Sequence, residues 1–266
     1  MIIDFHTHIF PDSLAPRAIE TLAKRSALVP YTDGTAKCTL KKMDEFSVDK
    51  SVCLNIATKP TQQRKINDFM KDIMNSSYGE RLIPFGTVHP DATDALDEIQ
   101  YIKDSSIKGI KLHPDYQNFY ADDKKMDGIY DVASQLDLPI IFHAGYDIGM
   151  GCPIHCTPLM IKKIAKRFPK LTVIAAHFGG NGMWNDALEL TSELENVYYD
   201  TAFPWNLDKI TAKKLISKKG ADKILFASDC PWDSPKRIID FIDSLQISSK
   251  EKELIFAENA KNLLNL

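Results

Sequence analysis

The stretch Met-Ile-Ile-Asp-Phe-His-Thr-His-Ile-Phe, residues 1–10, decides how the rest of the chain is interpreted. Ile3 and Phe5 predict a β-strand that ends in His6-Thr7-His8. Side chains alternate along a strand, so His6 and His8 point to the same face and can bind one metal ion together. If that face is the inside of a barrel, we expect Ile3 and Phe5 to face the surrounding helices.

The remaining sequence repeats a strand-then-helix pattern. Further strands are predicted at 51–57, 82–88, 107–113, 138–143, 171–177, 197–201 and 223–229. Helices are predicted within 11–26 and at 40–46, 61–78, 91–103, 124–136, 158–168, 183–194, 207–217 and from 235 onward, with Thr39 as the N-cap of the second. Several strands are nearly continuous apolar runs, as expected for parallel strands covered on both faces.

Eight strand–helix units in 266 residues predict an α/β protein with a single (β/α)8 TIM-barrel domain over residues 1–266. An open doubly wound sheet is the alternative. It would call for a dinucleotide fingerprint, and no G-x-G-x-x-G follows the first strand.

Composition excludes several functional classes. The formal net charge of −3 gives no electrostatic case for nucleic-acid binding, and no apolar run is long enough for a membrane span. The beginning of the chain lacks the basic start of a signal peptide. Five cysteines without framework spacing indicate a reduced, cytoplasmic protein. We expect a small-molecule substrate, and homo-oligomer formation stays open.

Polar residues collect at the ends of the predicted strands, where a TIM barrel has its active site. Six of the seven histidines lie there, and Asp229 ends the eighth strand. The six are His6, His8, His89, His113, His143 and His177. From strand parity, we expect His177 to share a face with Ala175. Imidazole and carboxylate groups are the ligands of catalytic Zn²⁺ and similar ions, which lower the pKa of bound water.

Five motifs occur in an order that resembles the amidohydrolase superfamily. They are Asp-Phe-His-Thr-His (4–8), Gly-Ile-Lys-Leu-His-Pro (109–114), Ile-Phe-His-Ala-Gly (141–145), Ala-Ala-His-Phe-Gly-Gly (175–180) and Phe-Ala-Ser-Asp-Cys-Pro-Trp (226–232). The most similar branch is the amidohydrolase-related group that includes aminocarboxymuconate-semialdehyde decarboxylase and predicted metal-dependent hydrolases of the TIM-barrel fold.

The resemblance implies a role for each matching residue. It gives one divalent metal ion, expected to be zinc, and the ligands His6, His8, His143 and Asp229. It makes His177 an acid/base beside the metal, with Asp229 also able to move a proton. In binuclear branches a carboxylated lysine at the position of Lys111 bridges two metals, so a second metal is the less favoured alternative.

Three hypotheses follow for the function. The first is a metal-dependent hydrolase that directs a metal-activated water at an amide, lactone or related carboxyl derivative. The second is metal-dependent, non-oxidative decarboxylation of an aromatic or unsaturated carboxylic acid, and the third is a non-catalytic metal-binding barrel. The scarcity of arginine near the strand ends favours hydrolysis, because a carboxylate substrate calls for a cation.

The other polar residues near the strand ends receive weaker assignments. We expect His113, Lys111, Tyr146 and Trp232 to bind substrate, with a Lys111–Asp4 ion pair as the alternative for the lysine. His89 is expected to be a turn histidine before Pro90. The segment 152–156 has two cysteines and a histidine but no fourth ligand, so a structural zinc is disfavoured there.

Overall fold

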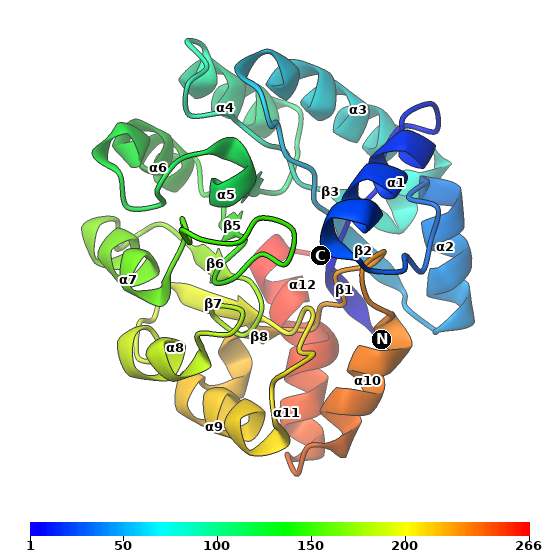
Figure 1. The fold of residues 1–266 in the computed structure, drawn as a ribbon, viewed down its shortest axis with the longest axis vertical. Helices are drawn as coiled ribbons and strands as arrows, with labels where there is room; N and C mark the ends of the chain where they lie inside the picture. Colours follow the sequence, from blue (N-terminus) through cyan, green and yellow to red (C-terminus); the bar gives the residue numbers. More distant parts are fainter.

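The computed structural model describes residues 1–266 and confirms the TIM barrel (Figure 1). The strands are β1 (Ile3–Thr7), β2 (Lys50–Cys53), β3 (Leu82–Pro84), β4 (Ile110–Leu112), β5 (Ile140–Phe142), β6 (Val173–Ala175), β7 (Val197–Asp200) and β8 (Ile224–Leu225). The helices are α1 (Ala15–Ser26), α2 (Ala36–Glu45), α3 (Gln63–Asn75), α4 (Ala95–Asp104), α5 (Pro114–Gln117), α6 (Asp127–Gln135), α7 (Pro158–Arg167), α8 (Trp184–Leu190), α9 (Lys209–Lys219), α10 (Pro235–Ser244), α11 (Ser249–Glu253) and α12 (Asn259–Leu264).

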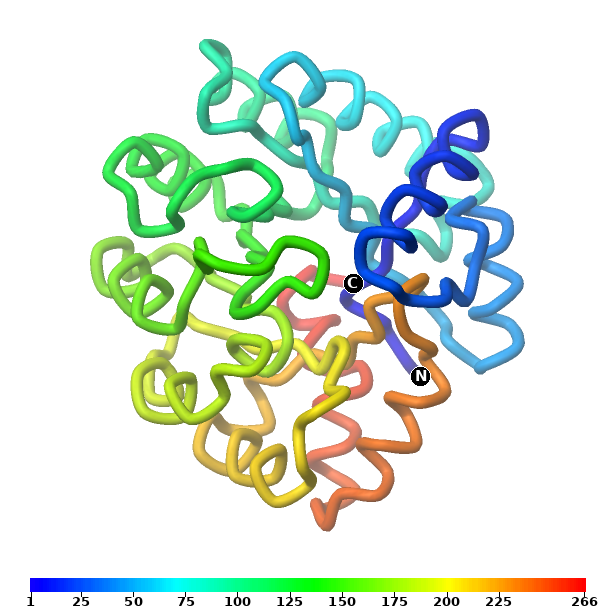
Figure 2. The backbone as a smooth tube through the Cα atoms, in the orientation of Figure 1, coloured from blue at the N-terminus to red at the C-terminus, as the bar shows by residue number.

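All eight strands run parallel and follow one another around the ring. β1 to β3 form one ladder and β4 to β8 a second. Backbone pairing of Gly86 with Ile110 joins β3 to β4, and pairing of Thr7 with Cys230 joins the end of β8 to β1. Phe5 N also donates to Phe226 O at 2.8 Å, so the barrel is closed at both junctions. Figure 2 follows the chain once around this ring, from blue to red.

Two apolar layers hold the barrel together. The outer layer lies between strands and helices and includes Ile110, Phe142 and Val173. The inner layer comprises Ile3, Phe5, Val52, Leu54, Ile83, Phe85, Ile141, Ile174, Ala202, Leu225, Ala227, Ala257, Ala260 and Leu264. The last three belong to the C-terminal helical segment, and Figure 1 shows α12 near the centre of the ring.

The orientation predicted for Ile3 and Phe5 is wrong, because both belong to the inner layer. The pairing of β1 with β2 shifts between Asp4 and Thr7, where β1 carries one more residue than its partner. Such a bulge reverses the alternation of side chains. Ile3 and Phe5 therefore fill the barrel below the bulge, while His6 and His8 reach the cavity above it.

A second parity argument also fails, at β6. Ala175 packs in the outer layer, yet His177 lines the central cavity. The backbone turns after the strand, and His177 and Phe178 have φ values of 60° and 55°. This left-handed turn redirects the histidine inward.

Most element boundaries are tighter than predicted, and one cap is wrong. Thr35 caps α2, since its hydroxyl accepts from Cys38 N at 3.1 Å. The predicted cap, Thr39, is buried inside the helix and its hydroxyl has no hydrogen-bond partner. The prediction began the helix at its first large apolar residue, whereas the helix begins with Ala36.

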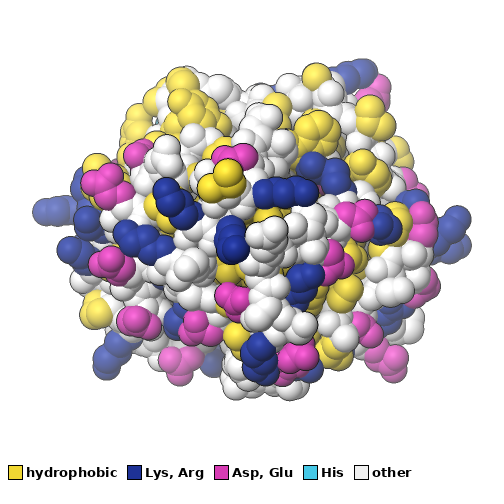
Figure 3. Space-filling view, turned by 90° about the horizontal axis from the view of Figure 1, so that it is seen from below, with side chains coloured by type: hydrophobic (Ala, Val, Ile, Leu, Met, Phe, Trp, Pro, Cys, Tyr) yellow, Lys and Arg dark blue, Asp and Glu magenta, His cyan; other side chains and the backbone are white.

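The face of the molecule shown in Figure 3 carries charged and hydrophobic side chains. Figure 3 shows acidic and basic side chains interspersed over most of the visible face, with hydrophobic side chains gathered along its upper edge. Mixed charge of this kind gives no field of a single sign on that face. None of the helices has the combined length and apolarity needed to cross a bilayer.

Candidate metal centre

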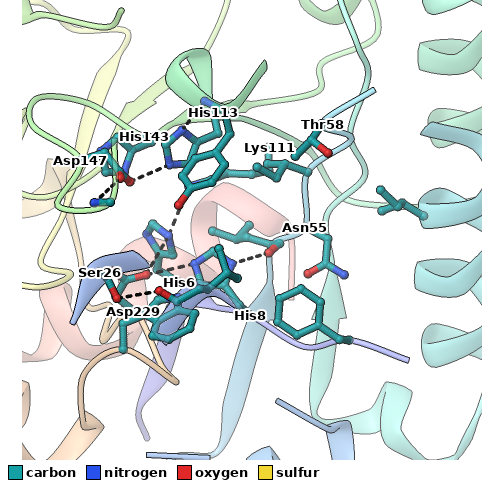
Figure 4. Close-up of a pocket in the computed structure, with 18 of the residues that line it drawn as sticks. His6, His8, Ser26, Asn55, Thr58, Lys111, His113, His143, Asp147 and Asp229 are labelled. Atoms are coloured by element: carbon teal, nitrogen blue, oxygen red, sulfur yellow. Dashed lines mark hydrogen bonds and ion pairs between the residues drawn. The ribbon is translucent and has the colours of Figure 1, made fainter. Parts of the chain in front are cut away.

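Three predicted ligands meet where the first strand joins the last. Asp229 Oδ1 lies 3.0 Å from His8 Nε2 and 3.4 Å from His6 Nε2, and the three atoms are all within 4.8 Å of one another (Figure 4). β1 supplies the two histidines, and the segment after β8 supplies the aspartate with φ 70°. We call His6, His8 and Asp229 the ligand triad.

Neighbouring acceptors fix the tautomers of the two triad histidines. His8 Nδ1 lies 2.6 Å from Leu54 O, and a carbonyl can only accept, so this nitrogen carries the proton. His6 Nδ1 donates to Asp200 Oδ2 at 2.8 Å. In the neutral imidazoles both Nε2 atoms then present lone pairs toward an Asp229 oxygen that also accepts. Acceptors that converge in this way suit a bound cation.

Burial keeps these imidazoles in the neutral form that binds metals. Loss of solvation lowers the pKa of His6 well below its usual value, with further contributions from Lys111 and the neighbouring histidines. Burial likewise lowers the pKa of His143 far below normal. The donor set therefore fits a divalent transition metal, whose ligands must be deprotonated.

His143 is the predicted ligand that lies apart from the triad. His177 Nδ1 donates to Ala202 O at 3.1 Å, so its Nε2 accepts from His143 Nδ1 at 3.0 Å. This leaves His143 Nε2 as a buried lone pair with no hydrogen-bond partner. An unpartnered buried acceptor is unfavourable by itself, and it leaves His143 Nε2 free to bind a cation.

His143 belongs to a second group of possible ligands, together with His113 and Asp147. The rings of His113 and His143 stack with centroids 4.2 Å apart, and Asp147 Oδ2 lies 3.2 Å from His113 Nε2 and 3.9 Å from His143 Nε2. Figure 4 shows this group facing the ligand triad across the cavity. Sequence reasoning missed Asp147, because it lies in a loop where no periodicity marks a carboxylate as functional.

Lys111 contacts the ligand triad. Its side chain points inward from β4, is fully buried, and places Nζ 3.2 Å from His6 Nε2. Burial lowers the pKa of Lys111 to about 8, although Asp200 and Asp229 act in the opposite direction. The alternative pairing with Asp4 is wrong. Asp4 is hydrogen-bonded instead by the hydroxyl and backbone N–H of Ser228.

Asp200 was also missed, although its signal was present. It ends β7, at the strand edge where the other polar residues were sought, and it is completely buried. Besides His6, its carboxylate accepts from the backbone N–H groups of His177 and Ala202 at 2.7 and 3.1 Å. Burial raises the pKa of Asp200 to about 6. Asp200 therefore orients two histidines of the site, His6 through its ring and His177 through its backbone.

These residues form the floor of a cavity of about 620 Å³. Tyr146 and Trp232 line it, as do the predicted histidines of strands one, four, five and six. His89 and His155 do not: His89 Nδ1 accepts from Asp91 N, and His155 pairs with Asp115. The walls are largely apolar, and no arginine lines the cavity.

The chain resembles characterised proteins along part of its length. It is 23% identical over 201 residues to a protein of Emericella nidulans named Decarboxylase orsB, which covers 55% of this chain and 60% of that protein. It is 27% identical over 137 residues to the gamma-resorcylate decarboxylase of a Polaromonas species, covering 44% of this chain and 41% of the relative. The matched regions are thus less than two thirds of either relative.

A solved structure supports the fold over the whole chain. A dihydroxybenzoic acid decarboxylase from a Polaromonas species, with bound manganese and the inhibitor 2-nitroresorcinol, superimposes with a TM-score of 0.74 at 19% identity. The match covers 100% of this chain and 97% of that one.

These comparisons overturn hydrolysis as the leading expectation. The relatives are decarboxylases, which favours the alternative that the sequence analysis placed second. The arginine argument went wrong because the cation beside the ligand triad is a buried lysine, Lys111. The family itself is as predicted: a model of the amidohydrolase family matches residues 3–266, and the chain belongs to that family.

Proposed function

We propose that this protein catalyses metal-dependent, non-oxidative decarboxylation of a hydroxylated aromatic acid or a similar unsaturated acid. The observation that carries the proposal is the ligand triad with Lys111 beside it, on the floor of a cavity with apolar and polar walls. An aromatic ring fits apolar walls, and an acidic group fits a cationic floor. The names of the relatives point to the same reaction class.

In this proposal His6, His8 and Asp229 hold the metal. His143, whose unpartnered Nε2 lies in the group with His113 and Asp147, is proposed as a further ligand from the sequence pattern. A bound divalent ion supplies positive charge that binds the acid and stabilises the electron pair left by the departing CO₂. Manganese accompanies the relative of known structure. Nitrogen and carboxylate donors also suit zinc, so the native metal is to be measured.

Lys111 is assigned to the substrate's acidic group. A protonated Nζ within 3.2 Å of His6 Nε2 attracts a carboxylate or phenolate to the triad. The low-polarity surroundings strengthen this attraction compared with water. A lysine with a pKa of about 8 is still mostly protonated at neutral pH.

The chemical step exchanges one bond for another at the same carbon. The bond between the ring carbon and the carboxylate breaks, its electron pair stays on the ring carbon, and a proton then bonds to that carbon. We assign proton transfer to His177 and Asp229, which both line the cavity. His177 Nε2 lies 3.0 Å from His143 Nδ1, and we assign this nitrogen of His177 as the atom that delivers the proton to the ring carbon.

A substrate screen tests the proposal. Metal-reconstituted protein is incubated with hydroxybenzoic and unsaturated acids, and separately with esters, lactones and amides. We expect CO₂ release from the acids only. Hydrolysis without any CO₂ release would contradict the proposal.

A variant pair links that activity to the site. His6→Gln is expected to abolish both metal content and CO₂ release. His155→Gln changes a histidine that lies outside the cavity and should leave both unchanged. Full activity of metal-free His6→Gln would exclude the assigned chemistry.

A further inference from the structure

The inward-facing side of α1 contacts the following loop in its first half and the cavity in its second half. Ala15 and Ile19 are buried, and a Cβ on Gly34 would lie only 2.7 Å from Ile19, so the first half packs against the following loop. One and two turns later on the same face, Leu22 and Ser26 line the cavity instead. The second half of α1 is therefore a cavity wall.

The helix α3 presents a second wall. Its buried face, which includes Asn67 and Met70, packs toward the barrel. A neighbouring stripe, with Ile66 and Phe69, is only partly buried and lines the same cavity. A helix on a TIM barrel needs one apolar face for packing, so a second apolar stripe calls for its own explanation.

The cavity is larger than its polar floor requires. A volume of about 620 Å³ lies in the range that holds drug-sized ligands, whereas a dihydroxybenzoate is a single substituted ring. In Figure 4, Asn55 and Thr58 lie at the side of the cavity away from His143 and Asp147. Ile56, between them in sequence, lines the cavity as well. The cavity thus continues from the ligand triad along the segment that leads into α3.

We infer that the substrate is an aromatic acid with an apolar substituent, an alkyl or aryl group of several carbons, that lies between α1 and α3. This inference rests on the proposed function for the acid end of the molecule. Leu22 of α1 with Ile66 and Phe69 of α3 form what we call the tail slot. Without a ligand these side chains face water, and an apolar group would remove that exposure.

Binding of the reaction product tests the tail slot independently of catalysis. Resorcinol and 5-pentylresorcinol are titrated into manganese-loaded protein by calorimetry. Each buried methylene contributes about fourfold to affinity, so the pentyl compound is expected to bind at least about 30-fold more tightly. Equal affinities for the two compounds would overturn the inference.

Two variants test whether the pentyl group binds in the tail slot. Leu22→Gln and Ile66→Gln are expected to weaken 5-pentylresorcinol about tenfold each and to leave resorcinol binding unchanged. Leu159→Gln, at a half-exposed leucine of α7 outside the cavity, is the matched control and should change neither. If the pentyl advantage persists in both slot variants, the substituent binds elsewhere and the inference is wrong.

Turnover separates this inference from the proposed function. CO₂ release is measured from 2,6-dihydroxybenzoate and from its 4-pentyl derivative, whose chain points away from the carboxylate. A higher kcat/KM for the pentyl acid, lost in Ile66→Gln, supports both ideas. A pentyl preference in binding without CO₂ release from either acid would refute decarboxylation and retain the slot. CO₂ release with no preference would retain decarboxylation and refute the slot.

Discussion

At the scale of single residues, the site depends on groups that hold the metal-binding histidines in place. Asp200 accepts from His6 Nδ1, and Leu54 O accepts from His8 Nδ1. Each contact sets which ring nitrogen keeps its proton, and so which nitrogen is free to bind a metal. The ligand triad is therefore oriented by hydrogen bonds made at the opposite edges of its imidazoles.

Asp200→Asn tests this orientation. The amide oxygen can still accept from the backbone N–H groups of His177 and Ala202, but the negative charge facing His6 is lost. We expect metal affinity to fall by about 10- to 100-fold while the fold is retained. Competition with a fluorescent chelator measures the affinity. Asp208→Asn, an exposed cap of α9, is the control and should bind metal normally; an unchanged affinity in Asp200→Asn would remove Asp200 from the site.

At the scale of elements, small departures from regular geometry aim the functional side chains. The bulge in β1 places two apolar residues and two histidines on the inside of one strand. The left-handed turn after β6 directs His177 inward. Strand parity therefore predicted the correct face for His6 and His8, although it placed Ile3 and Phe5 on the wrong face.

The start of α2 gives a test of element-level stability. Thr35→Ala removes the hydroxyl that accepts from Cys38 N, and the expected loss of stability is about 1 kcal/mol. In a protein of this size that loss corresponds to a thermal midpoint about 2 to 4 °C lower.

Thr39→Val is the matched comparison for the same helix. It replaces a buried hydroxyl that has no partner, so the midpoint should stay level or rise. If Thr39→Val lowered the thermal midpoint more than Thr35→Ala, Thr39 would be the cap of α2.

At the scale of the whole molecule, the barrel could be predicted from alternation because each strand is a short apolar run followed by an amphipathic helix. The ligand triad could be predicted because barrel strands bring their ends to one place. The bulge, Asp147 and the tail slot could not. They depend on backbone irregularity, loop conformation and the spacing between two helices, none of which has a periodic signature.

Metal removal should affect the stability of the entire fold. An ion that binds the native state alone stabilises it by RT ln(1 + [M]/Kd), about 2.7 kcal/mol at a hundredfold excess over Kd. We expect chelation to lower the thermal midpoint of the reconstituted protein and excess metal to restore it. His6→Gln should show one midpoint under both conditions. If the chelator leaves the thermal midpoint of the unaltered protein unchanged, the proposed metal site is contradicted.

Thiol labelling reports on the packing of the whole barrel. The five cysteines are free, with Cys152 exposed and Cys53, Cys156 and Cys230 buried. Burial raises the pKa of Cys53 to about 12 and the pKa values of the other two buried thiols well above normal. At pH 8, iodoacetamide should modify Cys152 first and leave the buried three intact, as peptide mass mapping would show. Rapid labelling of Cys230 would indicate that the segment after β8 opens.

The position of the metal site at the junction of β1 and β8 affects the stability of barrel closure. His8 and Asp229 lie 221 positions apart in sequence, and they flank the backbone pairing of Thr7 with Cys230. A cation shared by these side chains would hold together the junction at which the first and last strands of the barrel meet. Amide hydrogen exchange should then slow at residues 5–8 and 226–230 when metal is added, and change much less in the β4–β5 ladder opposite.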